Sequence, residues 1–214
     1  GLKKQYGNLI EDARTRWDVR LLQSNLAAEL SAGHTYTLGG GNESVSTQRT
    51  GLLGVNLELT RNGYRIKHIV KPAAWDTEVR SPFDRPGMTV SEGDYIHSVN
   101  GIKLDVNKDP YAAFENLDGE IVSIMISSSG NAKDAEKVVI ETLSPQQENM
   151  LRHLEWIENN RKMVEELSDG NLGYIYMSNT AGRGQLEVVK MYYGQYEKKG
   201  VINDERCNER GHIE

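Results

Sequence analysis

The chain has 214 residues and a net charge of −6, with 37% hydrophobic and 26% charged residues. This composition predicts one or two small domains with much surface, and the negative charge without a Lys/Arg block argues against nucleic acid as a partner. The single cysteine, Cys207, excludes an internal disulfide and a zinc site built from several cysteines. No apolar run approaches the roughly 18 residues that a membrane-spanning helix needs. The chain begins at Gly1 without a Met or a signal peptide, and we expect it to be a fragment of a longer protein.

The N-terminal segment is predicted to be helical. Residues 7–15 form a short helix, and a second helix runs over 18–32 with Asp18 as its N-cap. Gly33 ends this helix because glycine readily adopts the left-handed conformation that follows a helix C-terminus. A short strand over 34–38 and a Gly/Ser/Thr-rich connection up to residue 49 come next.

The middle of the chain contains two informative runs, Gly51-Leu-Leu-Gly-Val-Asn-Leu57 and Glu92-Gly-Asp-Tyr-Ile-His-Ser-Val-Asn-Gly101. The second run is a strand closed by Asn-Gly, which is a strong turn signal. A short helix is predicted over 109–117, capped by Asp109 with Pro110 at its first position. Together these features resemble a PDZ domain, with strands expected at 53–59, 64–70, 94–99, 121–127 and 137–142.

The first run indicates a binding site for a peptide end. Its bare backbone amides can hold a peptide carboxylate, while the following strand can accept the peptide as an extra strand. The candidate peptide-binding residues are Leu52, Leu53, Gly54 and Val55, with Arg49 placed to assist a carboxylate. The alternative is a purely structural strand-entry turn, with Arg49 as an ordinary surface cation.

The C-terminal third predicts a different kind of sheet. Ser144-Pro-Gln-Gln147 is a capping box that starts a helix reaching Leu167. A strand at 173–177, a helix at 184–198 and a strand beginning at 201 then form a β-α-β unit with parallel strands.

His34 is the candidate general base. It follows the end of a helix and precedes a glycine-rich segment, so the ring is expected to be exposed and the helix dipole favours its charged form. The alternative is an ordinary surface or cap histidine.

No pair of histidines has metal-ligand spacing, so we expect no metal site and no cofactor. The turn Asn208-Glu-Arg-Gly211 follows the last strand, where α/β proteins place oxyanion-binding amides.

In their order along the chain, these pieces resemble the tricorn protease family of serine peptidases, in which a PDZ domain interrupts the catalytic region. The resemblance is carried by five segments: Gly33-His-Thr-Tyr36, Gly51-Leu-Leu-Gly54, Trp156-Ile-Glu-Asn-Asn160, Gly173-Tyr-Ile-Tyr-Met177 and Asp204-Glu-Arg-Cys-Asn208. It implies an α+β chain with four parts. These are the end of a helical catalytic subdomain (1–46), a PDZ-type β-barrel or sandwich (47–143), a linker helix (144–169) and the start of an α/β catalytic subdomain (170–214).

The resemblance also implies that His34 is the catalytic base and that residues 208–211 form an oxyanion loop. Two departures stand out. Gly33 replaces a serine that commonly precedes the histidine, and Glu209-Arg210 replaces two glycines of the loop. A loop that needs positive φ would be strained by these residues. The nucleophilic serine is expected outside the 214 residues, so we expect this chain to be inactive alone.

The expected function is therefore that of a serine peptidase that hydrolyses peptides, in which the PDZ domain binds or guides peptide ends or serves as a structural insert. Two alternatives remain: a pure PDZ-type peptide-binding module and a degenerate, non-catalytic peptidase homologue. The family resemblance implies a homo-oligomer in the cytoplasm, and the sequence leaves the periplasm open.

Overall fold

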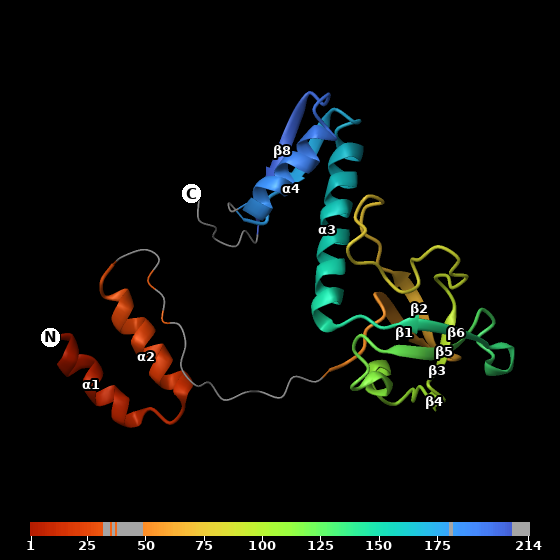
Figure 1. The fold of residues 1–214 in the computed structure, drawn as a ribbon, viewed down its shortest axis with the longest axis horizontal. Coiled ribbons are helices and arrows are strands. Elements are labelled where there is room, and N and C mark those ends of the chain that lie inside the picture. Colours follow the sequence, from red (N-terminus) through yellow and green to blue (C-terminus); the bar gives the residue numbers. More distant parts are fainter. Residues whose placement is uncertain (32–34, 36, 38–48, 180–181, 207–214) are drawn as a thin grey trace. The chain divides into compact units, whose positions relative to one another are not determined.

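The computed structural model describes residues 1–31, 35, 37, 49–179 and 182–206, and Figure 1 shows the course of the chain. The chain divides into two compact units, residues 1–47 and 48–214. Helices are combined with a mainly antiparallel sheet, so the expected α+β class is confirmed.

The first unit is a helical hairpin of α1 (Leu2–Asp12) and α2 (Arg16–Ala28). Tyr6 on α1 donates a hydrogen bond of 2.8 Å from its hydroxyl to the Glu29 carboxylate just after α2. Both helices begin earlier in the sequence than predicted. The strand expected at 34–38 lies outside the described residues, apart from Thr35 and Thr37, which are not in a strand.

The prediction that Asp18 caps α2 is wrong. Thr15 is the N-cap, and its hydroxyl accepts a hydrogen bond from the Asp18 amide. The Asp18 carboxylate in turn accepts a bond of 2.8 Å from the Thr15 amide. This reciprocal pair is a capping box, in which the acidic residue occupies the third helical position and the hydroxyl residue the cap.

The second unit contains the antiparallel sheet, whose strand order is β1-β2-β3-β5-β6 with the short β4 beside β3. The strands lie within two residues of the predicted ones, except that β4 was not predicted. Their bounds are β1 (Val55–Thr60), β2 (Gly63–Ile69), β3 (Tyr95–Val99), β4 (Ile102–Lys103), β5 (Ile121–Ser127) and β6 (Glu136–Glu141).

Alternating apolar residues of these strands form the core of the second unit. Leu53, Ile66 and Ile124 are fully buried there, together with Phe114. Phe114 comes from the 3-10 helix η1 (Pro110–Phe114), which is capped by Asp109 as predicted but is shorter than the expected 109–117. Burial of this aromatic ring fixes η1 against the sheet, since a phenylalanine contributes about 2–3 kcal/mol when removed from water.

Helix α3 (Pro145–Leu167) follows the sheet and leads to β7 (Leu172–Tyr176), α4 (Gly182–Tyr193) and β8 (Gly200–Asp204) (Figure 1). The predicted capping box of Ser144 and Gln147 is present at its start. Strands β7 and β8 pair in parallel. This is the β-α-β unit that the sequence predicts.

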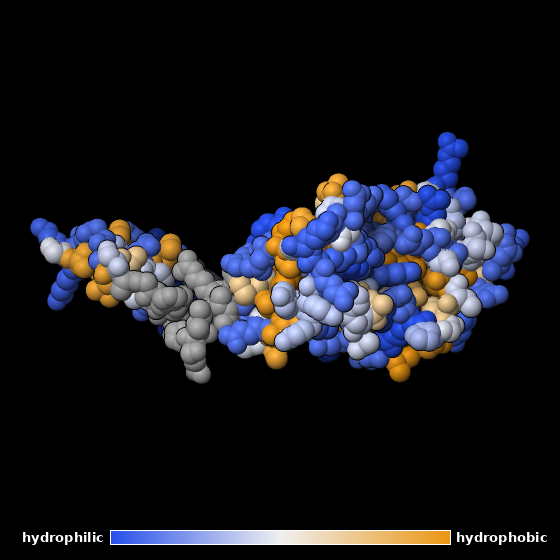
Figure 2. Space-filling model, turned by 90° about the horizontal axis from the view of Figure 1, so that it is seen from above, coloured by the Kyte–Doolittle hydropathy of each residue, from blue (hydrophilic) through white to orange (hydrophobic). Residues whose placement is uncertain are grey.

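Apolar side chains reach the surface in several places (Figure 2). On α4, Leu186 and Tyr193 have about 70% of their surface exposed (72% and 70%), and Val201 and Ile202 of β8 are also exposed. Large exposed apolar patches are typical of surfaces that contact other protein.

Candidate functional site: the Gly54 loop and the linker helix

Gly54 turns the chain into β1 and forms the first candidate site. Its φ is +62°, a conformation that glycine adopts at little cost. Leu53 and Val55 on either side are buried in the core. A Cβ atom on Gly54 would lie 2.8 Å from Leu151 Cδ2 and 2.9 Å from Ser81 Cβ. Backbone angle and close packing therefore both require glycine at this position.

The amide of Gly54 is already bound to a carboxylate of the same chain. It donates a hydrogen bond of 2.6 Å to Oε2 of Glu148, which lies on α3, 94 positions later in the sequence. The other carboxylate oxygen, Oε1, lies 2.6 Å from Arg152 Nη2. Glu148 is only 5% exposed. A buried carboxylate is costly unless it is paired and hydrogen-bonded, and here both oxygens have partners.

The same helix also binds the outer edge of β1. Arg152 donates hydrogen bonds from Nη2 to the Val55 carbonyl (3.0 Å) and from Nη1 to Asn56 Oδ1 (2.7 Å). The hydroxyl of Tyr111 on η1 lies 3.5 Å from the same carbonyl. Burial raises the pKa of Tyr111, with the nearby Glu148 charge as a further cause. Strand β1 is the end strand of the sheet, so this is the edge that an added strand would use.

The other predicted peptide-binding residues have internal partners. Leu52 forms an antiparallel bridge with Leu143 through two backbone hydrogen bonds of 2.8 Å. Arg49 forms an ion pair with Asp118, with 2.9 Å between Nε and Oδ1. A role of Arg49 toward a peptide carboxylate stays a prediction.

His68 joins the sheet to α3 a second time. Its Nδ1 lies 2.8 Å from Glu92 Oε1, and its Nε2 lies 2.7 Å from Glu155 Oε1. Burial lowers the pKa of His68, but the hydrogen bonds and charges of Glu155 and Glu92 outweigh it and raise the pKa above its usual 6.5. The protonated ring is thus favoured between two carboxylates.

The second candidate site lies at the carboxyl end of β8. Asp204 is buried and accepts a hydrogen bond of 2.7 Å from the Tyr174 hydroxyl. Arg206 binds both oxygens of this carboxylate, and its guanidinium lies 5.1 Å from the centre of the Trp156 ring. The hydrogen bonds of Arg206 hold the pKa of Asp204 far below its usual range despite its burial. Asn160 on α3 donates to the Tyr174 hydroxyl at 3.2 Å, so the strand end is tied to the helix.

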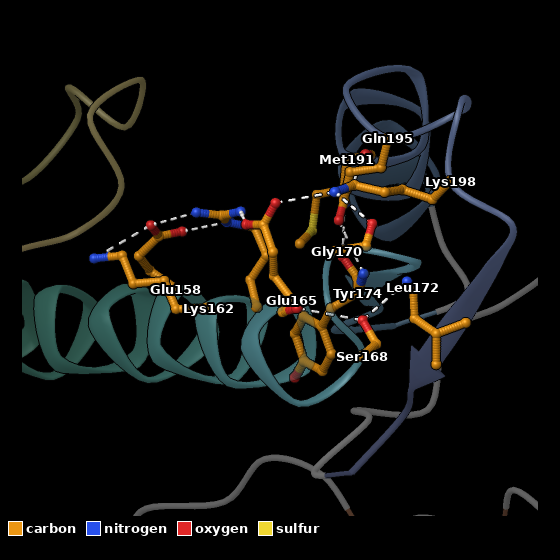
Figure 3. A network of polar contacts seen from close by, with 11 residues as sticks. Glu158, Lys162, Glu165, Ser168, Gly170, Leu172, Tyr174, Met191, Gln195 and Lys198 are labelled. Carbon is orange, nitrogen blue, oxygen red and sulfur yellow. Dashed lines mark hydrogen bonds and ion pairs between the residues drawn. The ribbon is translucent and has the colours of Figure 1, made fainter.

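The C-terminal half of α3 is bound to the β-α-β unit by a polar network (Figure 3). Lys198 donates to Glu165 Oε1 at 2.9 Å and to the Gly170 carbonyl at 3.0 Å. Gln195 bonds to the amide of Tyr174 at 2.9 Å and to its carbonyl at 2.8 Å. Helix α3 is thereby fixed at one end to the segment between α4 and β8, which is itself bound to β7, and at the other end to the Gly54 loop.

The predicted base His34 and the predicted oxyanion loop (Asn208, Glu209, Arg210, Gly211) lie outside the described residues. Within the part of the chain that the structure describes, no group of three or more His, Cys, Asp or Glu side chains is arranged to hold a metal ion. The described helices also include none that is long and apolar enough to cross a membrane.

Comparison with known proteins identifies the middle of the chain. Residues 51–145 match the family described as the tricorn protease PDZ domain. This stretch contains the Gly54 loop, the antiparallel sheet and the first residue of α3. The PDZ domain is of the tricorn type.

The resemblance to the tricorn protease family extends over the chain and is confirmed. The tricorn protease of Thermoplasma volcanium is 25% identical over 210 residues, which is 98% of this chain and 20% of that protein. Tricorn protease homolog 1 of Streptomyces coelicolor is 28% identical over 99% of this chain and 20% of its own length. The crystal structure of the tricorn protease has the same fold, with a TM-score of 0.84 at 23% identity over 98% of this chain and 20% of that one. The chain thus spans about a fifth of the length of these relatives.

Sequence reasoning did not find Glu148, Arg152 or the Asp204 cluster. The spacing of Glu148 and Arg152 on one helix face is visible in the sequence, but i,i+4 pairs of this kind are common on exposed helices. Nothing local indicates that the partner of Glu148 is an amide 94 residues earlier.

The packing at Gly54 gives a direct prediction. We expect Gly54→Ala to lower the free energy of unfolding by about 3 kcal/mol, because the new Cβ adds close contacts to the cost of a left-handed backbone. Gly119 is the matched control, since its φ is +69° and a Cβ there would meet nothing within 4 Å. Gly119→Ala should cost only about 1 kcal/mol. Urea unfolding of both variants measures the difference, and equal losses would contradict the packing argument.

His68 predicts a pH dependence of stability. Because its pKa is raised in the folded state, its contribution is complete below the unfolded value of 6.5 and is lost as the pH rises through the folded value. Burial lowers the pKa of His97, which acts in the opposite direction. The wild type should therefore lose more stability than His68→Gln between about pH 6 and about pH 9 in urea unfolding. The same slope in both proteins would refute the His68 assignment.

Proposed function

We propose that the chain is part of a serine-type peptidase that hydrolyses peptides, and that His34 is its general base. The observation that carries this proposal is the alignment with tricorn proteases along 98% of the chain, which includes the segment around His34 and the β-α-β unit as well as the PDZ domain. The parallel pair β7–β8 and the buried Asp204 at its carboxyl end support it, since α/β enzymes place reactive groups at that edge.

The nucleophilic serine would lie in the full-length protein outside these 214 residues. His34 would take its proton, and the amides of residues 208–211 would stabilise the oxyanion of the tetrahedral intermediate. The proposed division of the chain is a helical catalytic segment (1–46), the PDZ domain (47–143), the linker helix (144–169) and the start of the catalytic α/β subdomain (170–214).

For the PDZ domain, the Gly54–Glu148 hydrogen bond favours the role of a fixed insert over that of an independent adaptor, because an adaptor needs a free loop. The exposed apolar faces of α4 and β8 fit contacts with further peptidase subdomains or with other copies. A homo-oligomer in the cytoplasm is part of the same proposal.

A serine-reactive fluorophosphonate probe tests the catalytic proposal, alongside turnover of fluorogenic peptides. The full-length protein should be labelled, and its His34→Ala variant should lose about 1,000-fold or more in turnover, as expected for loss of a general base that activates a nucleophile. The isolated 214-residue chain should not be labelled. His97→Gln is a control histidine within β3, and it should keep near-wild-type turnover.

Three outcomes would contradict the proposal. His34→Ala with near-wild-type turnover would show that another residue is the base. Labelling of the 214-residue chain that disappears in His34→Ala would place the nucleophile within this chain. Full-length protein that is neither labelled nor active would instead favour the degenerate, non-catalytic homologue.

A further inference from the structure

The Gly54 loop offers two groups to an incoming peptide end. In binding by strand addition, the terminal carboxylate accepts hydrogen bonds from loop amides, and an amide of the peptide donates to the edge strand. Here the loop amide is that of Gly54, and the nearest acceptor on the edge is the Val55 carbonyl. Both are occupied by side chains of α3.

Glu148 and Arg152 supply the two groups that a peptide end would supply. The Glu148 carboxylate accepts from the Gly54 amide at 2.6 Å, and the Arg152 guanidinium donates to the Val55 carbonyl at 3.0 Å. The two residues are one helical turn apart on one face of α3, and they are ion-paired with each other. The helix thus presents an acceptor to the Gly54 amide and a donor to the carbonyl of the next residue, Val55, at the start of β1.

Leu151, from the same turn of α3, also covers the Gly54 loop. It is fully buried and packs against Val70 and Leu143 in the second apolar cluster of this unit. Its Cδ2 atom is so close to Gly54 that a Cβ there would lie 2.8 Å away. An apolar side chain, a carboxylate and a hydrogen-bond donor from one turn of α3 therefore cover the loop.

We propose that the start of α3 is an internal ligand of the PDZ domain, which occupies its carboxylate site in place of a peptide C-terminus. A peptide end then binds only when Glu148 is removed or displaced. Displacement must also disturb α3, which is held by the His68–Glu155 contact and is bound at its other end to Tyr174 of β7 and to Lys198, which follows α4. This inference depends on the PDZ domain and not on the catalytic proposal.

The smallest probe of this site is N-acetyl-L-valine, which carries one amide N–H and one free carboxylate. N-acetyl-L-valinamide is its matched control because it has the same side chain and size but a neutral carboxamide in place of the carboxylate. Titrations of the ¹⁵N-labelled 214-residue chain, followed at the Gly54 amide resonance, compare the wild type with Glu148→Ala. In the wild type we expect no shift of the Gly54 resonance. In Glu148→Ala we expect a saturable shift with the acid, and binding of the amide should be at least about tenfold weaker than binding of the acid.

Two further variants separate the carboxylate from a general loosening of the helix. Glu155→Ala removes another contact of α3 with the sheet but leaves Glu148 in place, so its Gly54 resonance should not respond. Glu148→Gln keeps the size of the side chain without its charge and should respond to the acid less than Glu148→Ala and more than the wild type. It also provides the test if Glu148→Ala loses the dispersed spectrum of a folded protein.

Several results would overturn the inference. They are an equal response in the wild type and the Glu148 variants, no response in either Glu148 variant, an equal response to acid and amide, and an equal response in Glu155→Ala. The inference holds only if the response requires both loss of the Glu148 carboxylate and a free carboxylate on the probe.

Discussion

The hydrogen bond between the Gly54 amide and the Glu148 carboxylate determines how the larger unit is assembled. It joins a loop with positive φ at the start of the antiparallel sheet to a helix that begins just after β6, the last strand of that sheet. A charged acceptor at 2.6 Å in a buried setting is a strong interaction, and loss of one partner would leave the other unsatisfied. The position of α3 beside the edge strand β1 therefore depends on a few groups near its first turns.

Helix α3 carries this constraint to the rest of the unit. Near its start, Glu148 and Arg152 hold the loop and the edge of β1. Further along, Glu155 meets His68. Near its end the helix is bound to β7 through Asn160 and Tyr174, and Glu165 is bound to Lys198 in the segment between α4 and β8 (Figure 3). A rigid helix with contacts along its length links the PDZ domain to the parallel strands.

Much of this fold could be predicted because its signals are local. The capping box at Ser144, the Asn-Gly turn at residue 100 and the alternating strands each depend on neighbouring residues. The error at Asp18 has a local cause too, since Thr15 and Asp18 both suit an N-cap and only the geometry separates them. The sequence identifies Gly54 as a candidate site residue, but it does not indicate that Glu148 binds the Gly54 amide. Contacts such as Gly54–Glu148, His68–Glu155 and Tyr174–Asp204 join residues far apart in the sequence, and polar residues of these types are usually solvated.

If a carboxylate of the chain itself occupies the Gly54 amide, hydrogen exchange at this one amide reports the bond. In the wild type the Gly54 amide should exchange slowly, with protection similar to that of core strand amides. In Glu148→Gln its exchange should be faster by about tenfold or more, while the amides of β5 stay protected. A Gly54 amide that exchanges freely in the wild type, or at the same rate in both proteins, would show that the Glu148 carboxylate does not hold it.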